Sequence, residues 1–71
     1  MDDADDIAAK LSVPERVLLF CLASGTEWAQ AGVTGATTTM MLVRGLVERD
    51  RAGGLKMTQQ GYEVFKVLIG G

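Results

Sequence analysis

The sequence contains no histidine and only one cysteine, Cys21. A zinc site built from Cys and His ligands and an internal disulfide framework both need more of these residues, so neither can form within one chain. Cys21 stands inside an apolar run, where a buried thiol that packs as a small hydrophobic side chain is expected rather than a reactive one. Stability must therefore come from the hydrophobic core.

Long apolar segments are also missing. The longest one runs only from Val17 to Ala23, far short of the roughly 20 residues that cross a bilayer. The first residues read MDDADD, whereas a secretory signal begins with basic residues followed by an apolar stretch. We therefore expect no membrane partner and a cytoplasmic location.

The chain is too short for a deep substrate cavity. Its 71 residues weigh 7.6 kDa, and in a domain of this size almost every large apolar side chain is needed for one core. The carboxylates, the lysines and Tyr62 all read as surface groups, and no two of them suggest a buried acid–base pair. We expect no enzymatic activity, no cofactor and no metal.

Charge is distributed unevenly along the chain. The net charge is −2, but four of the nine acidic residues are aspartates within the first six positions, which leaves residues 7–71 with a net charge of +2. Between residues 44 and 56 two acidic residues, Glu48 and Asp50, stand among cations. These cations are Arg44, Arg49, Arg51 and Lys56. The segment is a modest basic patch, the type of surface that binds phosphates.

The composition divides the chain into two parts. Residues 1–11 are an acidic N-terminal segment that either frays or forms one short helical turn capped by Asp5 and Asp6. Residues 12–71 carry the patterns of a folded domain.

The first helix of that domain has strong signals at both ends. Ser12 and Glu15 have the spacing of a capping box, and Pro14 lies in the first turn, where its missing N–H costs nothing. These residues predict a helix that runs to Ser24 and ends at Gly25. Its apolar residues surround it, so it is the predicted central element of the core.

A short helix is predicted next, capped by Thr26 and closed by Gly32. Such a short helix needs tertiary support. Trp28 is the expected anchor, since a role in the core is favoured for it over stacking on a ligand.

A third predicted helix is capped by Thr34 and ends at Arg44, with Gly45 after it. On a helical wheel Ala36, Met40 and Val43 share the face predicted to point inward. The opposite face is predicted to be polar and exposed. It contains Thr34, Thr37, Thr38, Met41 and Arg44.

The remaining residues predict a hairpin and a last helix. Leu46–Arg49 and Leu55–Met57 form short strands joined by the glycine-rich turn 50–54. Thr58 then caps a helix that extends through Ile69. Tyr62, Phe65 and Ile69 form its predicted inward face. The apolar arc of this helix is too wide for one contact with the core. Two alternatives remain for the additional apolar surface: contact with residues 1–11, or a helix-to-helix homodimer.

Residues 41–65 read MLVRGLVERDRAGGLKMTQQGYEVF and resemble a winged helix-turn-helix domain of the MarR type of bacterial transcriptional regulators. The likeness rests on Gly45, Leu46 and Val47 after the third helix, and on the segment 57–61, which is similar to the family's L-T-x-x-G start of the last helix. It extends over residues 12–69 and implies an α+β fold, mostly helical, with a two-stranded wing.

The resemblance also implies a function in transcription regulation. The helix that ends at Arg44 would enter the major groove of double-stranded DNA, and the wing around Arg51 would follow the phosphates or the adjacent minor groove. Threonine hydroxyls suit phosphates or base edges, Met41 suits a thymine methyl group, and Arg44 suits guanine or a phosphate. The DNA-binding residues implied in this way are Thr34, Thr37, Thr38, Met41, Arg44, Arg49, Arg51 and Lys56.

A second hypothesis remains open beside DNA binding. The acidic net charge and the uncharged face of the third helix favour a winged helix that serves as a protein–protein interaction module. A homodimer through the last helix is compatible with either hypothesis.

Overall fold

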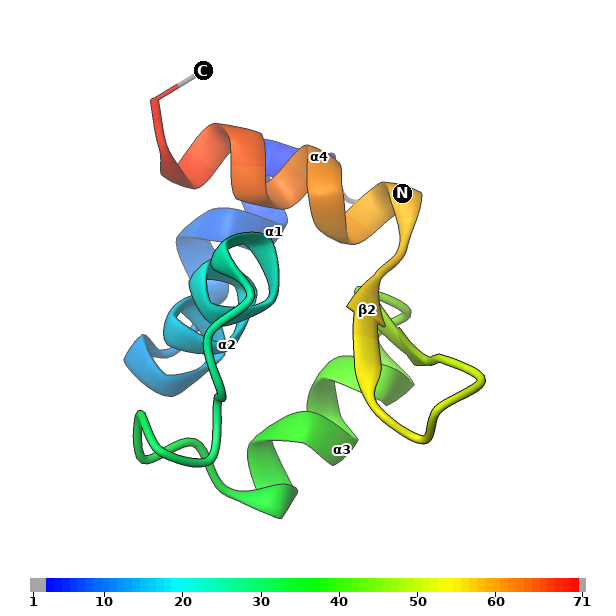
Figure 1. Cartoon of the computed structure of the whole chain (residues 1–71). Helices are drawn as coiled ribbons and strands as arrows, with labels where there is room; N and C mark the ends of the chain where they lie inside the picture. Colours follow the sequence, from blue (N-terminus) through cyan, green and yellow to red (C-terminus); the bar gives the residue numbers. More distant parts are fainter. Residues whose placement is uncertain (1–2, 71) are drawn as a thin grey trace.

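The chain folds into four helices and one β-hairpin over residues 3–70, the part that the computed structural model describes (Figure 1). The helices are α1 (Ala4–Lys10), α2 (Val13–Ser24), α3 (Gly35–Val43) and α4 (Gln59–Leu68), and the antiparallel strands are β1 (Val47–Arg49) and β2 (Leu55–Met57). The predicted fold class is confirmed: the protein is α+β and mostly helical, with helices and hairpin in the order of a winged helix.

Helix α2 lies between two layers. Figure 1 shows α1 and α4 at one side of the molecule, α3 at the opposite side, and the hairpin beside the C-terminal end of α3. The core fills the space between these elements. Its fully buried large side chains are Leu18, Leu19, Met41, Leu46, Val47 and Val64.

Helix α2 has the predicted ends. The Ser12 N–H donates to the Glu15 carboxylate at 2.9 Å, and the Ser12 hydroxyl accepts from the Glu15 N–H at 3.4 Å, which completes the capping box. Gly25 ends the helix with φ of 74°, a left-handed conformation that glycine adopts without strain. Cys21 is buried, as predicted.

Residues 4–10 of the acidic segment form helix α1. The Asp3 carboxylate caps α1 by accepting from the Asp6 N–H at 2.9 Å. Ala8 and Leu11 are each only 4% exposed and belong to the core, and α1 packs against α4. The segment is therefore helical rather than frayed, but the predicted cap is wrong: Asp3 caps α1, and Asp5 and Asp6 lie inside its first turn. Met1 and Asp2 lie outside the described residues.

The short helix predicted after Thr26 is wrong. The segment from Trp28 to Gly32 forms turns, in which the Ala31 N–H bonds to the carbonyl of Trp28 at 3.1 Å and the Gly32 N–H to that of Ala29 at 3.2 Å. Too few residues precede Gly32 to repay the cost of nucleating an α-helix. Trp28 is half-buried and packs against the core, in agreement with its expected role as an anchor.

A network of hydrogen bonds joins the end of α3 to the start of α4. Gly45 turns the chain with φ of 76°, and its carbonyl accepts from the Thr58 hydroxyl at 2.6 Å. The Thr58 N–H donates to the Leu46 carbonyl at 3.1 Å. The same hydroxyl accepts from the Gly61 N–H at 3.0 Å. Thr58 thus caps α4 and also fixes it to the corner where the hairpin begins.

The predicted inward face of α4 is wrong in part. Phe65 packs against the core, but Tyr62 and Ile69 are 51% and 56% exposed, while Val64 is fully buried. The rotation follows from Gly61, because its missing side chain lets the Leu46 backbone approach α4 closely. The face that contains Gly61 and Val64 must therefore point inward, and Tyr62 lies outside it.

Candidate nucleic-acid interface

Helix α3 is short and ends as predicted. The Thr34 hydroxyl accepts from the Thr37 N–H at 3.4 Å and caps the helix. The nine residues of α3 extend about 13 Å, after which Arg44 and Gly45 close it. Thr34 is exposed and Thr37 is half-buried.

The predicted orientation of α3 is wrong, and two predicted DNA-binding residues are consequently excluded from the surface. Met41 is fully buried and Thr38 is only 7% exposed. The Thr38 hydroxyl donates to the carbonyl of Gly35 at 2.8 Å, so its polar group is satisfied inside the helix and its methyl group can join the core. Neither side chain can reach a base or a phosphate.

The outward face of α3 consists instead of residues that the helical wheel assigned to the core. Met40 is 49% exposed and Val43 is 77% exposed, and Ala36 and Thr39 are exposed beside them. Consecutive pairs such as Met40 and Met41 have similar hydrophobicity, so the pattern of this nine-residue helix suits either rotation. The outward face is mainly apolar and carries no charge.

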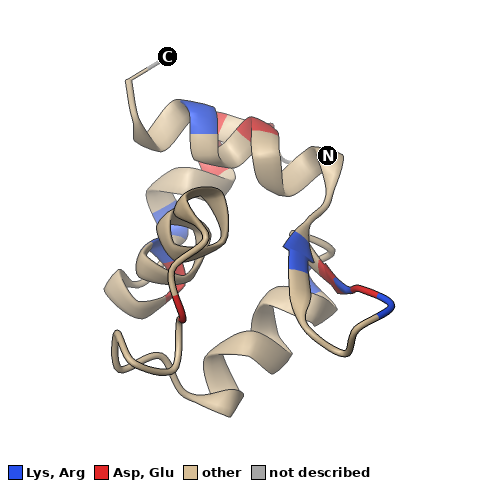
Figure 2. Ribbon diagram, in the orientation of Figure 1, with Lys and Arg blue, Asp and Glu red and all other residues tan. Residues whose placement is uncertain are grey.

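The hairpin bears most of the charge near α3 (Figure 2). Arg49 and Arg51 are exposed, and neither forms an ion pair within the described residues. Lys56 lies 3.3 Å from Glu48 across the hairpin, with both side chains more than half exposed, so this pair is worth little and can be exchanged.

Asp50 has a structural role in the hairpin turn. Its carboxylate accepts from the N–H groups of Ala52 at 2.9 Å and Gly54 at 2.8 Å. Gly53 adopts φ of 84° in the same turn. Both acidic residues of the hairpin therefore have other partners: Asp50 accepts from backbone N–H groups, and Glu48 pairs with Lys56. Neither of them pairs with Arg49 or Arg51, so these two arginines can contact phosphates.

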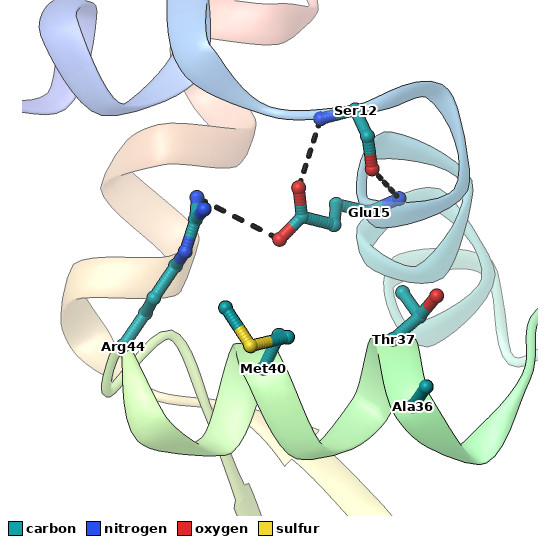
Figure 3. Close-up of a pocket in the computed structure, with 6 residues that line it drawn as sticks. All are labelled: Ser12, Glu15, Ala36, Thr37, Met40 and Arg44. Carbon is teal, nitrogen blue, oxygen red and sulfur yellow. Dashed lines mark hydrogen bonds and ion pairs between the residues drawn. The ribbon is translucent and has the colours of Figure 1, made fainter.

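Arg44 is held differently from the hairpin cations. It lines a shallow cleft of about 230 Å³ between the start of α2 and one side of α3, together with Ser12, Glu15, Ala36, Thr37 and Met40. Figure 3 shows its guanidinium group turned toward Glu15, with a nitrogen 3.6 Å from the carboxylate. The Glu15 side chain is only 9% exposed and that of Arg44 is 36% exposed.

Of the four predicted cations, Arg49, Arg51 and Lys56 lie on the hairpin, whereas Arg44 at the C-cap of α3 is paired with Glu15 of α2. Sequence reasoning assigned Glu15 only to the capping box and missed its second contact. No local signal marks that contact, because Glu15 and Arg44 are distant in sequence and meet only when α3 packs on α2.

Comparison of the chain with protein-family models, with curated proteins and with solved structures gave no match. Within residues 3–70, no group of three His, Cys, Asp or Glu side chains is arranged to hold a metal ion. In the same residues, every helix is too short or too polar to span a bilayer.

Proposed function

We propose that the protein is a winged-helix module that binds double-stranded DNA, with the hairpin on the phosphates and the outward face of α3 toward a groove. The observation that carries the proposal is the position of the hairpin, whose exposed Arg49 and Arg51 stand beside the C-terminal end of α3. Cations next to a helix that can enter a groove supply the register-setting phosphate contacts of such domains.

The number of available cations limits the expected affinity. Arg49 and Arg51 form no ion pair within residues 3–70, and Lys56 can leave its exposed partner, so a monomer neutralises about two to three phosphates. The logarithm of the association constant should then fall with the logarithm of salt concentration with a slope of about −2 to −3. Binding of this kind is weak, with a dissociation constant of about 10⁻⁴ to 10⁻⁶ M at physiological salt.

The contact of α3 with DNA would be mainly apolar. Met40 and Val43 are the exposed side chains that suit a thymine methyl group, and the Thr39 hydroxyl suits a phosphate or a base edge. Met40 and Thr39 take the roles that the sequence reasoning gave to Met41 and Thr38. This face offers no bidentate arginine for guanine, so little sequence discrimination is expected.

Titration of duplex DNA into ¹⁵N-labelled protein at about 50 mM salt tests the proposal. We expect the amide shifts of Thr39, Arg49 and Arg51 to move together and saturate, because these residues would lie at the interface. Shifts of α1 serve as the internal control and should stay in place. Unchanged hairpin shifts at millimolar DNA would contradict the proposal.

A second candidate function is favoured by the same apolar face. Exposed Met40 and Val43 next to Ala36 form a surface that a protein partner can cover. The two functions differ in their dependence on charge. Substitution of Arg49 and Arg51 by glutamine leaves Lys56 as the remaining hairpin cation and should strongly weaken the proposed DNA binding. Apolar docking on α3 should be nearly unchanged.

We also propose that two copies associate through α4. Tyr62 and Ile69 form an exposed strip together with half-buried Phe65. Phe20 of α2 extends this strip, since its ring packs edge-to-face on Phe65 with centroids 5.2 Å apart. Helix α1 also packs on α4, and Val64 of α4 is fully buried in the core, whereas Tyr62 and Ile69 remain exposed. A dimer would double the number of phosphate contacts.

A further inference from the structure

Helix α3 and its two caps contain a single charged residue, Arg44 at the C-cap. Its guanidinium group points toward Glu15 of α2, across a cleft that Ala36, Thr37 and Met40 of α3 also line (Figure 3). The cation that could strengthen DNA binding by α3 is therefore directed into a cleft at the side of the helix.

The partner of Arg44 is more buried than any other carboxylate in an ion pair of the described residues. Glu15 is 9% exposed, whereas Glu48 and Glu63 are 52% and 48% exposed in their pairs with lysines. One Glu15 oxygen accepts from the Ser12 N–H, and the other faces Arg44. A carboxylate that has lost most of its water depends strongly on its cation, and removal of that cation leaves a buried charge without compensation.

We infer that Glu15 is an autoinhibitory residue that withholds Arg44 from DNA phosphates. This inference rests on the proposed DNA-binding function. A phosphate can recruit Arg44 only if the buried Glu15 carboxylate gives up its counter-charge, so wild-type protein binds DNA with the hairpin cations and without Arg44. The exposed Glu48 imposes no comparable penalty on Lys56, because water replaces the lost partner there.

Glu15→Gln is the direct test. Glutamine keeps a carbonyl oxygen for the Ser12 N–H and is the other residue typical of this capping-box position, so α2 should remain intact, as circular dichroism can verify. Release of Arg44 adds one phosphate contact, which corresponds to about eight-fold tighter binding at 0.1 M salt and a salt slope steeper by about 0.9. Binding is measured by fluorescence anisotropy with a labelled duplex at several salt concentrations.

Two controls separate the release of Arg44 from a simple change of net charge. Glu27→Gln removes the same charge from an exposed residue that has no ion pair among residues 3–70, and it should change the affinity by less than about two-fold at 0.1 M salt. The double variant Glu15→Gln/Arg44→Gln should return to within about two-fold of wild type, because the released cation is then absent.

A second measurement follows the arginine side chains directly by NMR. In wild-type protein the side-chain Nε–H resonance of Arg44 should stay in place when duplex DNA is added, while that of Arg51 moves; in Glu15→Gln both should move. An affinity of Glu15→Gln equal to that of Glu27→Gln, or a wild-type Arg44 resonance that moves with that of Arg51, would overturn the inference while DNA binding itself stands. Absence of DNA binding by every variant, Glu15→Gln included, would instead overturn the proposed function.

Discussion

At the scale of single residues, the corner between α3 and α4 depends on two residues of opposite character, Thr58 and Gly61. Thr58 uses one hydroxyl as donor to Gly45 and as acceptor from Gly61, while Gly61 contributes by having no side chain. A Cβ atom built on Gly61 would overlap the Leu46 carbonyl oxygen. The L-T-x-x-G-like pattern at residues 57–61 therefore has a packing reason, independent of any function.

Gly61→Ala should lower the free energy of unfolding by about 2 kcal/mol or more, because the backbone of Leu46 has to move and buried packing is lost. Urea denaturation followed by circular dichroism measures the change. Gly35→Ala is the matched control, since a Cβ at Gly35 meets no atom within 4 Å, and it should leave stability unchanged or raise it by about 0.4–1 kcal/mol. Equal stability of Gly61→Ala and wild type would mean that α4 does not approach Leu46 this closely.

At the scale of elements, sequence reasoning was accurate for ends and inaccurate for rotations. The signals at Ser12, Gly25 and Gly45 are local, so α2, α3 and the hairpin begin and end within about one residue of prediction. The inward faces of α3 and α4 depend on tertiary contacts, such as that of Gly61 with Leu46, and similar neighbours such as Met40 and Met41 do not reveal them. The hairpin cations Arg49, Arg51 and Lys56 are accordingly exposed as a surface site requires, whereas Thr38 and Met41 of α3 are not.

The exposed strip on α4 yields a prediction at the same scale. Ile69→Glu should weaken self-association at least ten-fold, since burial of an isoleucine contributes about 1.5–3 kcal/mol. Ile69 is 56% exposed at the helix C-cap, so the fold should persist. Sedimentation equilibrium at several hundred micromolar measures the association. Val43→Glu, a change of equal charge on the exposed face of α3, is the control and should leave association unchanged.

At the scale of the whole molecule, the position of the acidic helix decides whether its charge opposes DNA binding. Asp5 and Asp6 are exposed in the first turn of α1, and α1 lies at the opposite side of the molecule from α3 (Figure 1). The longest dimension of the molecule is 29 Å. This dimension is several times the Debye length of about 8 Å at 0.15 M salt and is comparable to the Debye length of about 30 Å at 0.01 M, so charges on opposite sides of the molecule are screened from each other mainly at the higher salt concentration.

The variant Asp5→Asn/Asp6→Asn should therefore bind duplex DNA with nearly wild-type affinity at 0.15 M salt and clearly more tightly at 0.01 M. Asparagine keeps the helix, because Asp3 remains as the N-cap and the core residues Ala8 and Leu11 are untouched. Anisotropy titrations at the two salt concentrations measure the difference. An increase in DNA affinity of equal size at both salt concentrations would mean that the aspartates act at short range, with α1 close to the bound DNA. The DNA interface would then have to lie nearer α1 than α3. At 0.15 M salt the aspartates cannot act on phosphates bound at the hairpin, because their charge is screened over several Debye lengths.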